Sequence, residues 1–119
     1  MSANPVKVSI RYFVYERDNY TCQYCGLNIG ENDTGNLTVD HIVTKKAGGL
    51  HHEDNLRTSC RICNSRRGEK SIEEFRFLNR MYQAGIGGVI SVSQAQELLR
   101  RGVDLGLPSH HLFYFEELI

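Results

Sequence analysis

Two CxxC pairs, separated by 34 residues, constrain this 119-residue chain more than any other feature of its sequence. The first pair is Cys22 and Cys25, and the second is Cys60 and Cys63. One CxxC turn offers two thiolates to an ion, and two such turns complete a tetrahedral zinc site. Because four thiolates leave no position open for water, we expect Zn2+ with a structural role. Buried free thiols and a redox pair are the alternatives.

The sequence also carries expectations about the compartment. The first residues lack the apolar stretch of a secretory signal, and no apolar run approaches the ~20 residues that span a bilayer. We therefore expect a cytoplasmic protein with no membrane partner, where paired cysteines more often bind metal than form disulfides. With no Trp, the apolar core would be small for this length, so a bound metal would help to stabilise it.

The formal net charge is zero, but the charges are unevenly distributed. Residues 42–70 contain seven Lys or Arg against three Asp or Glu. Such an excess is typical of a surface that binds phosphates, although an ordinary solvated face would look the same. The candidates for contacts with DNA phosphates are Lys45, Lys46, Arg57, Arg61, Arg66 and Arg67.

The periodicity of apolar residues predicts an α+β fold. A helix is expected over residues 8–18, with Ile10, Phe13 and Val14 on one face. Strands are expected over 37–42 and 56–58, followed by a helix over 60–67. The expected local order is therefore strand, loop, strand, helix, with zinc joining the ends.

The last third of the sequence predicts further helices. Ser71 and Glu74 form a capping box that opens a helix reaching about Gln83. A second helix over 94–101 would be capped by Ser91 or Ser93. The apolar tail, residues 112–119, predicts packing against the domain; a self-association surface that makes a homodimer is the alternative.

Polar residues with catalytic chemistry lie between and beside the cysteine pairs: Asp40, His41, Asn55 and Asn64. Carboxylate and carboxamide oxygens suit Mg2+ or Mn2+, and a histidine beside such an ion can serve as a general base. Side chains alternate along a strand, so the adjacent Asp and His share a site only if the strand bends or ends there. His51 and His52 lie in a polar loop, where exposure to solvent is the expectation and approach to DNA or metal the alternative.

Taken together, five runs resemble the HNH endonucleases, and more narrowly their four-cysteine, McrA-like branch in bacteria and phages. The resemblance covers roughly residues 8–70. The runs are Tyr20-Thr21-Cys22-Gln23-Tyr24-Cys25-Gly26, Asp40-His41-Ile42-Val43, Gly48-Gly49, Asp54-Asn55-Leu56 and Cys60-Arg61-Ile62-Cys63-Asn64. The resemblance implies a ββα-metal (His-Me finger) core stapled by a four-cysteine zinc site, with flanking helices at both ends.

The resemblance also implies roles for the polar residues. His41 would be the general base, Asn55 would fix the loop that holds the imidazole, and Asp40 and Asn64 would bind the catalytic ion. Asn64 stands where many members have His, and its oxygen favours Mg2+ or Mn2+ over Ni2+ or Zn2+. Thr44 stands where the family often has Pro.

The activity that the resemblance implies is metal-dependent DNA cleavage by an endonuclease or nickase, which leaves 5′-phosphate and 3′-hydroxyl ends. A non-catalytic, zinc-stabilised nucleic-acid-binding module is the alternative. We expect residues 1–70 to form the nuclease core with its N-terminal helix and zinc knuckles. Residues 71–119, to which the resemblance does not extend, would form a helical extension packed on that core as one compact unit.

Overall fold

The computed structural model describes residues 6–118. Its elements are α1 (Val8–Arg17), η1 (Glu31–Asn36), β1 (Leu37–His41), η2 (Lys45–Ala47), η3 (Glu53–Asn55), β2 (Leu56–Cys60), α2 (Arg61–Arg67), α3 (Ile72–Gln83), α4 (Val92–Arg100) and α5 (Tyr114–Glu117). They form two compact units: one holds the described residues up to Glu69 together with those from Phe113 onwards, and the other holds Lys70–Leu112. Among the described residues, no helix is long and apolar enough to cross a membrane.

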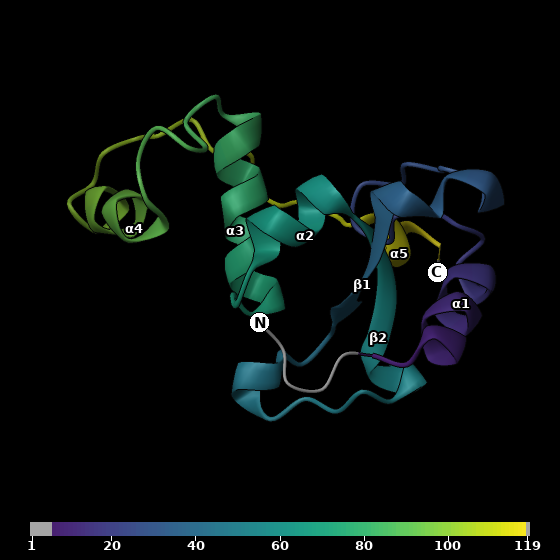
Figure 1. Cartoon of the computed structure of the whole chain (residues 1–119). Coiled ribbons are helices and arrows are strands. Elements are labelled where there is room, and N and C mark those ends of the chain that lie inside the picture. The colour runs from purple at the N-terminus through teal and green to yellow at the C-terminus, as the bar shows by residue number, and fades with distance from the viewer. Residues whose placement is uncertain (1–5, 119) are drawn as a thin grey trace. The chain divides into compact units, whose positions relative to one another are not determined.

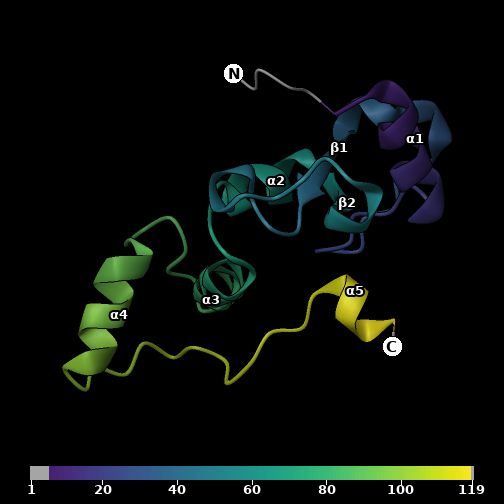
Figure 2. The same ribbon diagram turned by 90° about the horizontal axis from the view of Figure 1, so that it is seen from below.

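The first unit is built around a two-stranded antiparallel sheet. Leu37 pairs with Cys60 and His41 pairs with Leu56, so the end of β1 lies beside the start of β2. Helices α1 and α2 lie on opposite sides of these strands (Figure 1 and Figure 2). The predicted α+β class, with a ββα core and flanking helices at both ends, is confirmed.

The apolar core of the first unit lies between α1 and the sheet. It consists of Val14, Tyr15, Leu37, Val39 and Leu56, all less than a tenth exposed. The prediction placed Phe13 beside Val14 on the buried face of the first helix. Val14 is buried, but Phe13 is 48% exposed, and Tyr15, two positions further on, is buried instead. Every position from Tyr12 to Tyr15 is apolar or aromatic, so helical spacing alone did not determine which face would dock on the sheet.

The second unit contains α3 and α4. The predicted capping box of Ser71 and Glu74 is present at the start of α3. Ser91, rather than Ser93, caps α4, where it forms a capping box with Gln94. These local hydrogen bonds satisfy backbone N–H groups that the first turn of a helix leaves without partners.

The apolar tail returns to the first unit. Phe113 is 1% exposed, and its ring meets that of Tyr24 edge to face, with centroids 5.3 Å apart. The short helix α5, which the sequence did not predict, follows directly. Tail residues therefore contribute to the core beside the first cysteine pair.

Candidate metal centre and active site

The four cysteine thiols converge at one point of the first unit. The sulfur atoms of Cys22, Cys25, Cys60 and Cys63 all lie within 4.8 Å of one another. The sulfurs of Cys25 and Cys60 are 3.9 Å apart. A zinc–sulfur bond of about 2.3 Å implies sulfur–sulfur distances of about 3.8 Å in a tetrahedron. The cluster therefore fits a structural metal such as zinc, as the spacing predicts.

Backbone N–H groups donate hydrogen bonds to two of the four sulfur atoms. Cys60 is the N-cap of α2, and its sulfur accepts a hydrogen bond from the backbone N–H of Cys63 at 3.4 Å. In the first pair, the sulfur of Cys22 accepts from the backbone N–H of Cys25 at 3.5 Å. A hydrogen bond from the Cys63 thiol lowers the pKa of Cys22 and correspondingly raises the pKa of Cys63. Donors directed at sulfur favour thiolates, which is the form that binds metal.

Three of the four predicted polar site residues border one pocket. Asp40, His41 and Asn64 line a hollow of about 180 Å³, together with Lys45 from the turn that follows β1. Adjacent side chains within a strand point to opposite faces of the sheet. Because β1 ends at His41, this rule no longer holds there, and Asp40 and His41 can border the same pocket. Asn64 comes from the middle of α2, which packs on that end of the strand.

Asp40 is held in a buried polar cluster. It is 7% exposed, and its Oδ2 accepts hydrogen bonds from the guanidinium of Arg67 at 2.5 Å and from the hydroxyl of Tyr24. Burial, together with the charge of Asp40, raises the pKa of Tyr24, so this phenol stays protonated and donates. Two donors from within the protein thus engage one carboxylate oxygen of Asp40.

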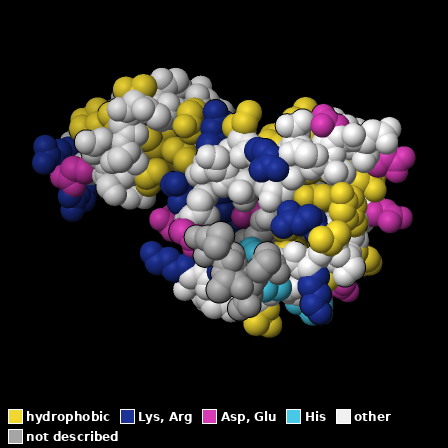
Figure 3. All heavy atoms as spheres, viewed as in Figure 1, with side chains coloured by type: hydrophobic (Ala, Val, Ile, Leu, Met, Phe, Trp, Pro, Cys, Tyr) yellow, Lys and Arg dark blue, Asp and Glu magenta, His cyan; other side chains and the backbone are white. Residues whose placement is uncertain are grey.

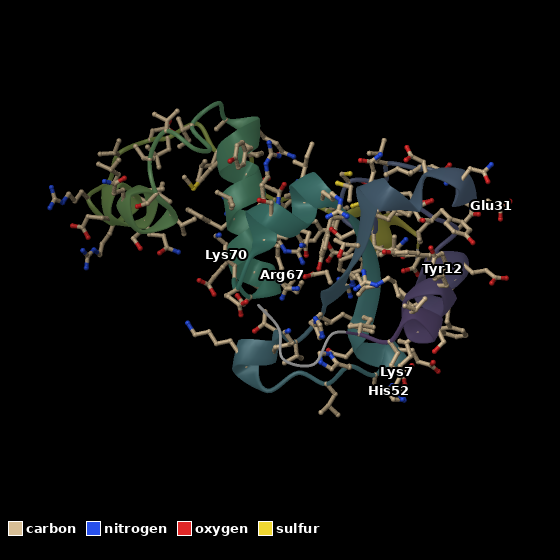
Figure 4. The ribbon with its side chains drawn as sticks, viewed as in Figure 1. Lys7, Tyr12, Glu31, His52, Arg67 and Lys70 are labelled. Atoms are coloured by element: carbon tan, nitrogen blue, oxygen red, sulfur yellow. The ribbon has the colours of Figure 1, made fainter. Side chains whose placement is uncertain are left out.

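The guanidinium of Arg67 also donates hydrogen bonds to the backbone at the end of β1. Its Nη1 also donates to the carbonyl oxygen of His41, and its Nη2 donates to that of Ile42 at 2.9 Å. Figure 4 shows Arg67 reaching from α2 toward β1. The side chain is only 1% exposed, so it does not offer its guanidinium to a phosphate. Its predicted place among the DNA contacts is therefore corrected to an internal one.

His41 contacts a second imidazole. Its Nε2 lies 2.9 Å from Nδ1 of His51, and the ring centroids are 5.0 Å apart. Burial lowers the pKa of His41, and the neighbouring His51 and Lys45 lower it further. A histidine with a lowered pKa is neutral at pH 7 and has a lone pair available to accept a proton.

Asn55 closes the loop that follows β1. Its Oδ1 accepts from the backbone N–H of Val43 at 2.9 Å, and its Nδ2 donates to the carbonyl oxygens of Val43 at 3.1 Å and Leu50 at 2.9 Å. Gly49 permits this closure, because a Cβ atom there would lie 1.8 Å from the carbonyl oxygen of Val43. Asn55 therefore ties both ends of the loop together and does not line the pocket itself.

The remaining basic candidates divide by exposure. Lys45, Lys46, Arg61 and Arg66 are exposed, whereas Arg57 is half-buried, with its guanidinium carbon 3.8 Å from the centroid of the Phe115 ring. On the visible face of the first unit, Lys and Arg side chains stand as separate groups, with His side chains toward its lower edge (Figure 3). Positive charge is thus spread over this face rather than gathered in one patch.

Sequence reasoning missed two residues of this site. Tyr24 lies inside the first CxxC pair, where nothing in its spacing indicates a bond to Asp40. His51 was expected to face solvent but is half-buried against His41, and only the neighbouring His52 is exposed. The one available signal was the Gly48-Gly49 pair, which lets the loop turn back.

The fold and the site together define a ββα domain with a four-cysteine metal centre. Residues 22–70 match the model of the HNH endonuclease family, so this segment is similar to that family. The matched segment includes both cysteine pairs, which is consistent with the four-cysteine branch of that family. The proteins of this family act on nucleic acids, which is the substrate class that the match points to. Searches among curated proteins and among solved structures found no significant match.

Proposed function

We propose that this protein is a metal-dependent DNA endonuclease or nickase that hydrolyses phosphodiester bonds to 5′-phosphate and 3′-hydroxyl ends. The observation that carries the proposal is the pocket bordered by Asp40, His41 and Asn64 within the matched segment. A carboxylate, an imidazole and a carboxamide at one hollow supply two oxygen ligands and one base. A general base beside oxygen ligands for a metal ion can support hydrolysis of a phosphodiester.

His41 is the general base in this proposal. Its lowered pKa favours the neutral imidazole at pH 7, so the ring accepts a proton from water as the oxygen attacks phosphorus. Asn55 and Arg67 support it indirectly, the first by closing the loop and the second by binding the carbonyl oxygen of His41. Both contacts hold the backbone around the base in one geometry.

Asp40 and Asn64 are the residues that would hold Mg2+ or Mn2+. Their oxygens suit a hard ion. When bound, such an ion supplies electrostatic stabilisation of the charge that develops on the phosphate and the leaving oxygen. Lys45, which lines the same pocket, is the candidate contact for a flanking phosphate. Lys46, Arg61 and Arg66 are the further exposed candidates.

One observation favours the second candidate function, a zinc-stabilised nucleic-acid-binding module without catalysis. The bonds from Arg67 and Tyr24 make Asp40 part of a buried network, and such a network also serves purely to hold α2 against β1. In that case the protein binds DNA through its exposed Lys and Arg side chains and leaves the phosphodiester bonds intact.

The test is cleavage of supercoiled plasmid by zinc-loaded protein with added Mg2+ or Mn2+. Wild type is compared with His41→Ala and with His110→Ala, which removes an exposed histidine of the second unit. We expect nicked or linear plasmid from wild type and from His110→Ala, and intact plasmid from His41→Ala. Zinc content and circular dichroism check that each variant is folded. Binding of DNA without cleavage by wild type would select the binding module instead.

A further inference from the structure

The contact between His41 and His51 couples the protonation sites of two rings. A hydrogen bond between Nε2 of His41 and Nδ1 of His51, which lie 2.9 Å apart, requires a proton on one nitrogen and a lone pair on the other. The tautomer of one neutral ring therefore determines that of the other. The hydrogen bond with His51 therefore determines which nitrogen of His41 is free to act as a base.

His51 is held in this place by the loop rather than by its own side chain alone. The carbonyl oxygen of Leu50, the residue before it, accepts a hydrogen bond from Asn55 at 2.9 Å. The backbone N–H of Gly49 donates to the carbonyl oxygen of Thr44 at 2.9 Å. These two bonds draw the loop back toward the end of β1, so that the loop brings His51 to His41.

We propose that His51 is a positioning residue, whose Nδ1 accepts the hydrogen bond from Nε2–H of His41 and leaves Nδ1 of His41 free to take the proton from water. This inference rests on the proposed function, because it specifies the atom of the base. The opposite arrangement, with His51 donating, would occupy the lone pair at Nε2 of His41 and place the ring's proton on Nδ1. Neither nitrogen of His41 would then be free to accept a proton.

Among the described residues, His51 is the hydrogen-bond partner of Nε2 of His41, although the carboxylate of Glu69 also borders the pocket. Lys45 and Arg67 influence the imidazole through their charges, but both side chains carry only donors. Asp40 already accepts bonds from Arg67 and Tyr24 at its Oδ2. The contact also persists after proton transfer, because the imidazolium of His41 keeps its Nε2–H directed at neutral His51. In catalytic triads, too, a hydrogen bond at one ring nitrogen orients the histidine and fixes its tautomer, so that the other nitrogen can accept a proton.

The first test reads the tautomer directly and needs no substrate. We would record 15N NMR spectra of the His41 ring at pH 8 in the zinc-loaded full chain, with assignment by loss of the signals in His41→Ala. The variants are His51→Leu, which removes the acceptor, and His51→Asn, whose amide oxygen can replace Nδ1. His52→Leu is the matched control, because His52 is exposed and adjacent.

We expect the Nε2–H tautomer of His41 in wild type, His51→Asn and His52→Leu, and a mixture of tautomers in His51→Leu. A predominant Nδ1–H tautomer in wild type would overturn the proposal. So would an unchanged tautomer in His51→Leu. These outcomes are independent of whether the protein cleaves DNA.

The second test measures plasmid nicking by the same variants. A positioned general base contributes about 10²–10⁴-fold to a rate, so loss of its orientation in His51→Leu should lower kcat about tenfold or more. His51→Asn should recover most of that loss, and His52→Leu should nick as wild type does. Wild-type rates in His51→Leu would overturn the positioning role while the nuclease assignment stands. Absence of cleavage by wild type would overturn the nuclease assignment and leave the tautomer result intact.

Discussion

The backbone N–H of Phe115 donates a hydrogen bond to the carbonyl oxygen of Gln23 at 2.8 Å, which joins the C-terminal tail to the first cysteine pair. The neighbouring N–H of Tyr114 bonds the carbonyl oxygen of Tyr24 at 3.0 Å in the same way. Residues 90 and 92 positions apart in the chain thus share backbone hydrogen bonds inside the first unit. The tail is therefore a structural part of the metal-bearing domain.

Removal of the Phe113 ring should destabilise that domain strongly. Phe113→Ala deletes a side chain that is 1% exposed, and such substitutions cost about 3–5 kcal/mol. We would measure the free energy of unfolding by denaturant titration and zinc retention under a chelator. Leu118→Ala, at a position 62% exposed, is the control and should change stability by less than about 0.5 kcal/mol. Equal stabilities for the two variants would contradict the packing role of the tail.

Removal of the structural metal should unfold the first unit. Without the ion, the four cysteines, whose sulfurs lie within 4.8 Å of one another, would lose the bonds that join the two pairs, and metal binding is coupled to folding in such sites. We expect one zinc ion per chain by elemental analysis, loss of circular dichroism signal on chelation, and recovery on adding zinc but not Mg2+. Cys60→Ser should give less than one ion per chain. Full retention of structure by the metal-free protein would count against a structural role.

Arg67 should prove essential for stability rather than for DNA affinity. Arg67→Met would leave Asp40 as a buried charge without its partner, and removal of one member of a buried pair costs about 3–5 kcal/mol. Arg66→Met, at the adjacent exposed position, should lower the free energy of unfolding much less than Arg67→Met does, and it should weaken DNA binding. Denaturant unfolding and the salt dependence of binding separate the two effects. A stable Arg67→Met protein with weakened DNA binding would restore Arg67 as a phosphate contact.

The pH dependence of nicking should reflect the lowered pKa of His41. The ordinary pKa of histidine is 6.5, and burial lowers it here. Because the base must be neutral, and a lowered pKa keeps it neutral to more acidic pH, the rate should fall to half its plateau below pH 6.5. A pH–rate profile of plasmid nicking under single-turnover conditions measures this midpoint. An acidic midpoint above pH 6.5 would be inconsistent with this environment of His41.

The two serines near the start of α4 should differ in their importance. Ser91 accepts a hydrogen bond from the backbone N–H of Gln94 at 3.0 Å, and loss of such a cap costs about 1 kcal/mol. Ser93 lies inside the helix and is exposed, so Ser93→Ala should be neutral or slightly stabilising. Amide hydrogen exchange within α4 would report the difference. Faster exchange in Ser93→Ala than in Ser91→Ala would contradict the assignment of the cap.

Much of the fold was predictable because its signals are local. A CxxC turn and a capping box both depend on residues three positions apart, so Cys60-Cys63 and Ser71-Glu74 could be read from spacing alone. The buried face of α1 could not be read in this way, because a run of apolar residues satisfies more than one face. The docking of Tyr15 instead of Phe13 depends on the shape of the sheet.

The candidate site shows the same division. The identities of Asp40, His41 and Asn64 led from the sequence to the hypothesis of metal-dependent hydrolysis, because the chemistry that a side chain can perform follows from its type. Whether Asp40 meets Arg67 or solvent, however, depends on how α2 docks on β1. Charged residues are usually exposed, so sequence reasoning placed Arg67 at the surface.

The sequence by itself determined the α+β class, the metal-binding cysteines, the helix caps and the set of groups available for chemistry. Only the tertiary structure decided that His51 contacts His41, that Arg67 is internal and that the tail returns to Gln23. The physical reason is that hydrogen bonds within one turn are encoded by neighbouring residues. Contacts across 10 to 92 positions arise only when burial of the apolar core closes the intervening loops.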